Sequence, residues 1–202
     1  MRSSVFFSIL GAAFVVASPR AALAVTPPEP VWFAGFHEPF LQTGWEIRTD
    51  RQVGGETEAQ WAVDAEGVAR FVGSLHRPGG VAFAHARAEQ AIAAGLPETI
   101  EAFVVRVRGD GRRYMMSVMT ADAHEGVHYR AEFSTAQGEW STVRLPLPEF
   151  KPFFRAFWVA HGTLRPEQVR GFGFMVAGEE QGDFELLVDY VAALGPDGRG
   201  DS

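Results

Sequence analysis

Two histidines and a glutamate form the motif with the most specific chemistry in this sequence. His124, Glu125 and His128 stand at the spacing H-E-x-x-H, in which a helix places two histidines on one face for zinc and a glutamate beside them as general base. Gly126 lies inside the motif and a strand pattern starts at Tyr129, and both features disfavour that helix. The segment is therefore interpreted as a connection between two strands, with a zinc site as the alternative.

Other catalytic signatures are missing from the sequence. It has no cysteine, which removes thiol nucleophiles, disulfides and thiolate metal ligands. It also lacks the G-x-S-x-G turn of hydrolases, the phosphate-binding loop G-x-x-x-x-G-K-[ST], and a G-x-G-x-x-G fingerprint after a strand. We therefore expect a protein that is not an enzyme, that uses no cofactor and that holds no metal.

Five arginines fall on predicted strands, which concentrates positive charge in an otherwise acidic chain. They are Arg87, Arg106, Arg108, Arg130 and Arg144. Four of them share the parity opposite to the bulky apolar residues, so they are candidates for a sheet face that binds carboxylates, phosphates or sugar hydroxyls. The alternative is a ladder of cross-strand ion pairs with neighbours such as Glu101 and Glu132.

Residues 150–158 contain five aromatic side chains in nine positions. Pro152 interrupts the stretch, and its apolar residues follow neither the period of a strand nor that of a helix, so we predict a long loop. The loop either closes one end of the core or exposes its rings to a partner. If it binds a partner, we expect the more exposed of Phe153 and Trp158 to be the anchor.

Three tryptophans are candidates for stacking against a sugar ring, although such rings more often pack in a core. They are Trp61, Trp140 and Trp158. Together these considerations give the candidate residues for partner or ligand binding, which are Phe153, Arg155, Trp158, Arg87, Arg108, Tyr114 and Trp140.

The elements that must position these side chains are short strands separated by glycine turns. Residues 103–108 and 114–118 alternate apolar with polar positions, and the turn between them contains Gly109, Asp110 and Gly111, so the pattern predicts a β-hairpin. Further structural turns are predicted at Gly54, Gly55, Gly79 and Gly80. About ten strands are expected from such patterns, with little helix. The fold class is therefore all-β, an antiparallel β-sandwich of jelly-roll type.

The first 24 residues are typical of a secretory signal peptide. Arg2 precedes an apolar run, Pro19 ends it, and Ala22-Leu23-Ala24 forms a small-x-small cleavage site. The run is too short to span a bilayer, which takes roughly 20 apolar residues. We therefore expect an exported protein, periplasmic or secreted, with no transmembrane segment after removal of the signal. An uncleaved anchor is the alternative.

The remaining boundaries follow from composition. Residues 25–39 form a proline-rich lead-in, residues 40–194 the sandwich domain, and residues 195–202 a flexible tail. The 202 residues carry 18 basic and 25 acidic side chains, a net charge of −7. Nucleic-acid binding is excluded on this ground, because phosphate contacts need a basic face.

Several short motifs occur in a fixed order between roughly residues 40 and 193. They are Asp50-Arg51-Gln52-Val53-Gly54-Gly55, Gly79-Gly80-Val81-Ala82-Phe83, Arg106-Val107-Arg108-Gly109-Asp110-Gly111, Val143-Arg144-Leu145-Pro146 and Gly171-Phe172-Gly173-Phe174. This series resembles the complex I intermediate-associated protein 30 family. The resemblance implies a galactose-binding-like jelly roll and a non-catalytic assembly factor, known in mitochondria for helping to build the membrane arm of NADH:ubiquinone oxidoreductase.

Two function classes follow from these observations. The first is a non-catalytic binding module that acts as an assembly factor or chaperone for a membrane-associated protein complex, which makes a membrane-associated protein the expected partner. The alternative is an exported carbohydrate-binding module, for which the tryptophans and arginines would supply the contacts.

Overall fold

Strands account for most of the chain in the computed structural model, which describes residues 30–89, 91–92, 96–121, 127–154, 157–160 and 162–196. Six strands form one sheet: β1 (Pro30–Gly35), β3 (Glu58–Val63), β4 (Ala69–Leu75), β6 (Ala102–Gly109), β9 (Trp140–Pro146) and β13 (Gly182–Leu194). Seven strands form the second: β2 (Glu46–Thr49), β5 (Ala82–Ala88), β7 (Arg113–Thr120), β8 (Val127–Ser134), β10 (Lys151–Phe154), β11 (Phe157–Trp158) and β12 (Val169–Gly178).

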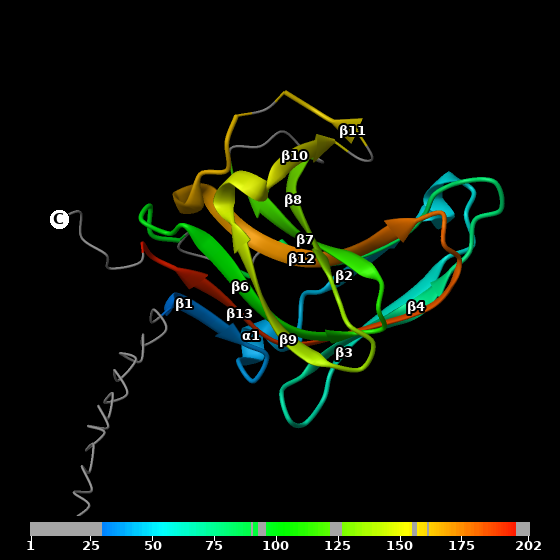
Figure 1. Cartoon of the computed structure of the whole chain (residues 1–202), viewed down its shortest axis with the longest axis horizontal. Helices are drawn as coiled ribbons and strands as arrows, with labels where there is room; N and C mark the ends of the chain where they lie inside the picture. The colour runs from blue at the N-terminus through cyan, green and yellow to red at the C-terminus, as the bar shows by residue number, and fades with distance from the viewer. Residues whose placement is uncertain are drawn as a thin grey trace, which may run out of the picture.

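The two sheets lie face to face as the layers of a sandwich (Figure 1). The first has the order β3-β4-β13-β6-β9, with β1 also paired to β13, and the second has the order β11-β10-β8-β7-β12-β5-β2. All pairs of these strands are antiparallel. Within the described residues, the connections hold one short α-helix, α1 (Pro39–Gln42), and three 3-10 turns, η1 (Asp50–Val53), η2 (Leu147–Glu149) and η3 (Pro166–Gln168). The predicted antiparallel sandwich is confirmed.

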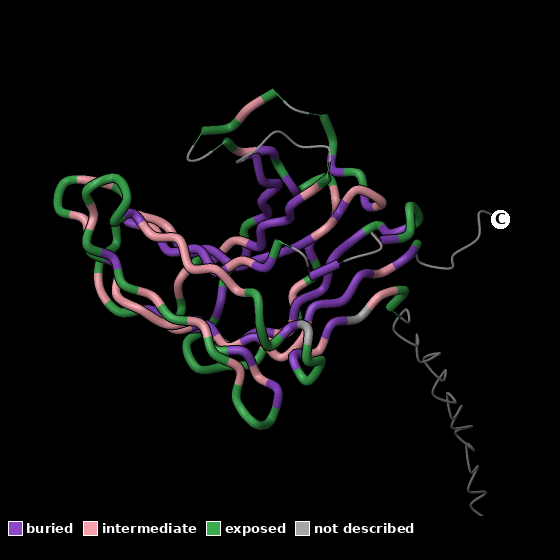
Figure 2. Tube along the Cα trace, turned by 180° about the vertical axis from the view of Figure 1, so that it is seen from behind, coloured by how far each residue is buried: buried purple, intermediate pink, exposed green. Residues whose placement is uncertain are grey.

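Aromatic side chains fill the space between the layers. In Figure 2, the segments coloured as buried lie in both layers. Phe172 and Phe174 alternate along β12 and are fully buried, as the period-two pattern predicts. Trp61 stacks on Trp45 with ring centroids 3.8 Å apart and lies parallel to Phe174 at 6.1 Å. Trp61 is therefore a packing residue and not a platform for a ligand.

The sandwich begins earlier than the sequence predicts. Residues 25–39 were expected to be a lead-in, but Pro30–Gly35 form β1, which pairs with the carboxyl-terminal half of β13. Ala34 and Phe36 are completely buried in the core. The proline content hid this strand because Pro30 stands at its first residue, where a missing N–H is tolerated.

The aromatic stretch is not a loop. Residues 151–154 form β10, which pairs with β8, and residues 157–158 form β11, which pairs with β10 at the end of the sheet. Pro152 is buried inside β10, and its carbonyl accepts a hydrogen bond from the backbone N–H of Val159 (3.1 Å). A proline near the edge of a sheet removes one donor without breaking the strand, and the loop prediction overlooked this.

A turn lies at residues 109–111, but the hairpin predicted around it is wrong, because β6 pairs with β13 and β9 whereas β7 pairs with β8 and β12 in the other sheet. The turn explains the position of Tyr114. Gly111 has a φ of 94°, which an L side chain rarely adopts. The carboxylate of Asp110 accepts hydrogen bonds from the Tyr114 hydroxyl (3.0 Å) and the backbone N–H of Glu185 (3.0 Å). Tyr114 is completely buried. The prediction that it binds a partner or ligand is wrong, because its ring is in the core and its hydroxyl anchors the turn.

Asp50 is a completely buried carboxylate that joins three segments where β2 ends. It accepts hydrogen bonds from the Thr57 backbone N–H (3.1 Å), the Thr57 hydroxyl (2.7 Å) and the Phe83 backbone N–H (3.1 Å). A Cβ at Gly55 would collide with the carboxylate, while Gly54 turns the chain with a φ of 88°. The predicted glycine turn therefore allows the chain to fold around the Asp50 carboxylate.

We predict that Asp50→Ala lowers the free energy of unfolding by about 3 kcal/mol or more, because it leaves three buried donors without an acceptor. Asp50→Asn keeps one acceptor oxygen and should cost less. The exposed Asp183 on β13 provides the control, since Asp183→Asn should change the value by no more than about 0.5 kcal/mol. Urea denaturation measures all three, and equal stability of Asp50→Ala and Asp183→Asn would contradict the assignment.

Candidate functional site

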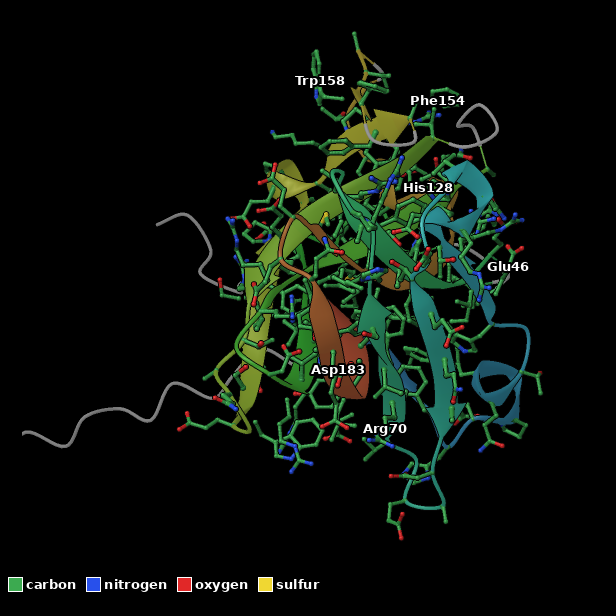
Figure 3. The ribbon with its side chains drawn as sticks, turned by 90° about the vertical axis from the view of Figure 1, so that its right-hand side faces the viewer. Glu46, Arg70, His128, Phe154, Trp158 and Asp183 are labelled. Atoms are coloured by element: carbon green, nitrogen blue, oxygen red, sulfur yellow. The ribbon has the colours of Figure 1, made fainter. Side chains whose placement is uncertain are left out.

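The outer face of the seven-stranded sheet carries polar and aromatic side chains that point away from the core. We call it the polar face, and it consists of Glu46, Arg48, His85, Arg87, Ser117, His128, Arg130, Lys151, Phe153 and Trp158. In Figure 3, Glu46 lies at one side of the sheet, His128 lies among its strands, and Trp158 and Phe154 lie at the far end.

Strand register brings these residues into rows. One row crosses the sheet from Glu46 through Arg87, then Gly173, Ser117 and Arg130, and ends at Lys151. Residues directly opposite each other on antiparallel strands point to the same side. Gly173 contributes no side chain between Arg87 and Ser117, and the Arg87 side chain reaches His128 on β8.

Arg87 is the centre of the hydrogen-bond network on this face. Its Nε and Nη2 donate to Glu46 Oε2 at 3.1 and 2.8 Å, and Nη2 also forms an ion pair with Glu89 at 2.9 Å. Its Nη1 lies 3.2 Å from His128 Nε2. His85 Nε2 is 2.6 Å from the Ser117 hydroxyl. The side chains of Arg87, His128, His85 and Ser117 are largely shielded from water, whereas those of Glu46 and Glu89 are about half exposed.

The contact with Arg87 fixes the state of His128. A guanidinium can only donate, so His128 Nε2 must accept, and the neutral imidazole then carries its proton on Nδ1. His128 is 7% exposed, and its Nδ1 has no hydrogen-bond partner among the described residues. His128 therefore presents a buried N–H donor with no acceptor.

Arg130 is a second buried donor without a partner. It is 8% exposed, and its Nε makes no hydrogen bond within the described part of the chain. Its guanidinium carbon lies 5.3 Å from the centroid of the Phe153 ring. A cation over an aromatic face is attracted to it, but the ring does not satisfy the N–H groups.

Burial controls the pKa values of this cluster. Burial, together with the charges of Arg87 and Arg130, lowers the pKa of His128 to about 4. Burial also holds the pKa of His85 well below its usual range, helped by His128, Arg130 and Arg87. The pKa of Arg130 is lowered by burial to about 10. At neutral pH both histidines are therefore neutral while Arg130 stays charged.

The structure brings together three of the predicted binding residues and separates the others. Arg87, Phe153 and Trp158 all lie on the polar face. Arg155, predicted to stand beside the anchor, lies outside the described residues. Among the two candidates for the anchor, Trp158 is 63% exposed and Phe153 is half-buried, so Trp158 is the more exposed ring.

Arg108 and Trp140 lie on the outer face of the other sheet. The two residues are opposite each other on β6 and β9, and the guanidinium carbon of Arg108 lies 5.5 Å from the centroid of the Trp140 ring. Arg106 lies at 5.3 Å from the same ring and pairs with Asp189 at 3.2 Å. The prediction of one face lined by four arginines is therefore wrong, because β6 and β9 belong to the six-stranded sheet.

The two interpretations of the arginines each apply to one sheet. On the six-stranded sheet Arg144 forms an ion pair with Glu101 at 3.9 Å, in agreement with a ladder of cross-strand pairs. On the polar face Arg87 is paired and Arg130 is not. The distinction depends on which strands are neighbours, and this order is not visible in the local sequence.

Five members of the polar face were not predicted from the sequence: Glu46, Arg48, His85, Ser117 and Lys151. His85 and Ser117 alternate with the buried residues of strands that were recognised, so their outward parity was available as a signal. That parity gave no sign of their burial, since His85 and Ser117 are 5% and 0% exposed. Their neighbours on the sheet cover them.

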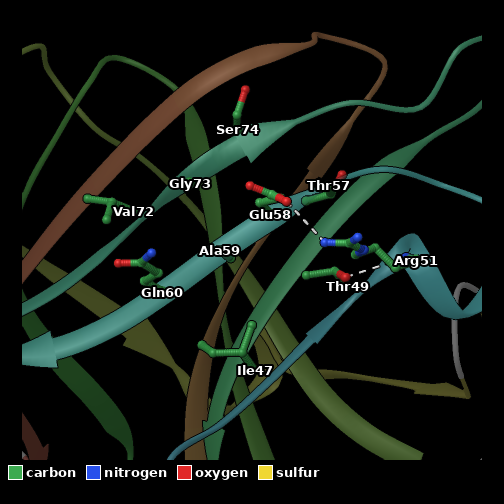
Figure 4. A pocket seen from close by; sticks show the side chains of 10 residues that line it. All are labelled: Ile47, Thr49, Arg51, Thr57, Glu58, Ala59, Gln60, Val72, Gly73 and Ser74. Atoms are coloured by element: carbon green, nitrogen blue, oxygen red, sulfur yellow. Dashed lines mark hydrogen bonds and ion pairs between the residues drawn. The ribbon is translucent and has the colours of Figure 1, made fainter.

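A groove of about 650 Å³ opens elsewhere, where the outer strands β2 and β3 meet (Figure 4). Its lining includes Ile47, Thr49, Gln60 and Ser74, and an ion pair between Arg51 and Glu58 (3.1 Å) crosses it. No unpaired buried polar group faces it among the described residues that line it. The polar face is therefore the stronger candidate site.

The H-E-x-x-H segment connects two neighbouring strands, as predicted. It follows β7 and leads into β8, on which His128 lies. His124 and Glu125 lie outside the described residues. Within the described ranges, no group of three or more histidine, aspartate or glutamate side chains is arranged to hold a metal ion.

We predict that the two neutral histidines make stability depend on pH. The pKa of His128 is about 4 in the folded chain against 6.5 when unperturbed, so the unfolded chain binds more protons between these values. Stability is therefore complete above about pH 6.5 and falls as the pH drops toward 4, by up to about 3 kcal/mol for this group.

Unfolding free energies at pH 4.5 and 7.5 test this. His128→Gln should reduce the difference between the two pH values, while His76→Gln, at an exposed position, should leave it unchanged. An undiminished difference in His128→Gln would show that the acid sensitivity arises elsewhere.

The chain is similar in fold to several solved structures. The family 11 carbohydrate-binding module of the cellulosomal cellulase Lic26A-Cel5E of Clostridium thermocellum superposes with a TM-score of 0.55 at 12% identity, covering 88% of this chain and 100% of that one. The family 11 module from Clostridium thermocellum in complex with a β-1,3-1,4-mixed-linked tetrasaccharide gives a TM-score of 0.54 at 15% identity, with coverages of 83% and 98%. At these identities the similarity shows the fold alone, and it confirms the predicted jelly roll.

Two further comparisons concern sequence and membrane insertion. No curated protein sequence matches this chain. Among the described residues, none of the helices has the length and apolar character needed to span a bilayer.

The family assignment rests on a match across nearly the whole sandwich. The model of the family named complex I intermediate-associated protein 30 matches residues 34–188, from β1 into β13. This range includes the Asp50 turn, the Asp110 turn and the polar face. The chain therefore belongs to the complex I intermediate-associated protein 30 family.

Proposed function

We propose that this chain is a non-catalytic binding module that acts as an assembly factor or chaperone for a membrane-associated protein complex. Membership of the complex I intermediate-associated protein 30 family supports this proposal and makes NADH:ubiquinone oxidoreductase the complex to test first. The observation that carries it is the exposed aromatic hairpin formed by β10 and β11, at the end of the seven-stranded sheet.

The hairpin exposes aromatic rings on both of its sides. Phe157 is 72% exposed and Trp158 is 63% exposed. Trp158 is opposite Phe153 and Phe157 is opposite Phe154, so the two rings of β11 point to opposite sides of the strand. A partner that encloses the hairpin can bury both rings, and aromatic residues of this kind dominate protein interfaces. Two-sided exposure therefore favours a protein partner.

We further propose that the protein is exported and acts in the periplasm or outside the cell. The support is the sequence pattern of residues 1–24, which has the charge, apolar run and cleavage site of a signal peptide. Mass spectrometry of the protein from its native host should show a mature chain that starts at Val25. A mature mass that includes residues 1–24 would contradict the proposal.

We predict that Trp158→Ala weakens partner binding by at least about 2 kcal/mol, which is roughly 30-fold in affinity, with a much smaller effect on stability. The ring is mostly exposed, so folding buries little of it. Phe153→Ala should show the reverse balance, because Phe153 is half-buried and lies against Arg130. Pull-downs from the membrane fraction and thermal melts measure the two effects.

Trp140→Ala is the matched control, since Trp140 is a partly exposed tryptophan on the other sheet. It should leave capture of the complex unchanged. Normal capture by Trp158→Ala, or early unfolding of that variant, would place the partner surface elsewhere.

The second candidate function is that of an exported carbohydrate-binding module. The polar face favours it, because unpaired buried donors lie beside the rings of Phe153 and Trp158, and such combinations suit small polar ligands. The fold of the family 11 carbohydrate-binding modules supports it as well. Saturable binding on a glycan array that is lost in Trp158→Ala would establish it.

A further inference from the structure

The charge of Arg130 has no partner on the polar face. The side chain is 8% exposed, its Nε is unsatisfied, and no described carboxylate forms an ion pair with it. Removing a cation from water costs several kcal/mol unless an anion or a set of acceptors replaces the lost hydration. Among the described residues, the buried positive charge of Arg130 thus has no anion paired with it.

The acidic residues near Arg130 already form ion pairs with other arginines. Glu46 binds Arg87 and Arg48, and Glu89 binds Arg87. Glu132, two residues after Arg130 on β8, is paired with Arg113 at 3.8 Å. The residue directly opposite Arg130 on β10 is another cation, Lys151, whose amino group donates to the Pro148 carbonyl. The neighbourhood of Arg130 therefore carries a local excess of positive charge.

His128 adds a second unsatisfied donor on the same strand and the same side. It is two residues from Arg130, which places the two side chains about 7 Å apart along β8. Its Nδ1–H is buried and unpaired because Nε2 accepts from Arg87. Among the described residues of this part of the polar face, the buried side-chain atoms without a partner are both donors, and donors select a ligand group that only accepts, such as an ionised carboxylate.

Aromatic rings adjoin these donors. Phe153 is opposite His128 on β10 and lies against Arg130, and Trp158 is opposite Phe153 on β11. Polar donors thus lie on one side and flat apolar surfaces on the other. A ligand that fits must combine a carboxylate with a ring whose face is apolar enough to lie on Phe153 or Trp158.

We propose that the polar face binds a uronic acid residue of a saccharide, with its carboxylate at Arg130 and His128 and its ring against Phe153 and Trp158. This inference rests on the carbohydrate-binding candidate and names its ligand class. It shares Trp158 with the protein interface proposed for the aromatic hairpin, which also uses Phe157 on the opposite side of β11.

Isothermal titration calorimetry of the mature protein with a galacturonate trisaccharide tests the inference. The fully methyl-esterified trisaccharide has the same rings and linkages without the charge, and a hexaglutamate peptide has the charge without the sugar. We expect the trisaccharide acid to bind, its ester to bind at least tenfold more weakly, and hexaglutamate not to bind. Arg130→Gln should weaken binding of the acid at least tenfold and leave the ester unaffected.

Two variants guard against a folding artefact. Arg130→Lys keeps the charge and loses Nε–H, so a folded protein with intermediate affinity is expected. Arg144→Gln removes an arginine from the other sheet and should bind like the parent. Thermal melts report whether each variant is folded.

The outcomes separate the inference from the function on which it rests. Equal binding of acid and ester, with loss in Trp158→Ala, would overturn the uronate and keep the carbohydrate-binding function. If hexaglutamate binds as strongly as the trisaccharide acid, the inference that the ligand is a saccharide is overturned. If no saccharide binds, both the inference and the carbohydrate-binding candidate fail, and the assembly proposal stands or falls on its pull-downs.

Discussion

The period of the β-strand is the constraint on which the core and the candidate site both depend. In β8, Tyr129 and Ala131 face the core while His128 and Arg130 face outward. A shift of one residue against β7 would exchange the two sets and bury Arg130 among aromatic rings. That shift would place a charge in an apolar core, and the free-energy cost would exceed the contribution of any single contact to the stability of a typical domain. The polar face therefore exists in one register only, and the same register that packs the core aligns the row from Glu46 to Lys151.

The sequence predicted features that depend on local pattern and missed those that depend on strand order. Alternation identified β12 and β8, and the Gly109-Asp110-Gly111 turn was located correctly, because both are short-range properties. The strands on either side of that turn, β6 and β7, belong to different sheets and do not form the expected hairpin. Arg108 and Arg130 share an outward parity, but parity cannot say that β6 and β8 belong to different sheets. Pro152 suggested a loop because proline opposes most strands, yet it lies in the part of β10 that is not paired with β11, where a missing N–H is tolerated. Of the candidate site, Arg87, Phe153 and Trp158 were predicted, whereas His85 and Ser117 were missed because their burial is created by neighbours from distant parts of the chain.

The two candidate functions meet at a single side chain. Trp158 lies at one end of the polar face and also belongs to the aromatic hairpin. Phe157, its neighbour on β11, points away from that face. A loss of binding in a Trp158 variant is therefore expected under both candidate functions. A Phe157 variant would affect only the protein interface, and an Arg130 variant only the ligand site on the polar face. This geometry allows one small domain to hold a soluble ligand and a protein partner on adjacent surfaces, with Trp158 at their boundary.

The long strand β13 determines when the fold can form. It pairs with β4 along its first half, with β1 along its second half and with β6 over most of its length, so three strands between residues 30 and 109 depend on residues 182–194. The six-stranded sheet has no central strand until the last part of the chain is available. Such contacts between distant residues slow folding, because the closing of long loops must come before the contacts that reward it. A chain shortened within β13 would leave three strands with an unpaired edge each, and an open edge of this kind is a template for aggregation.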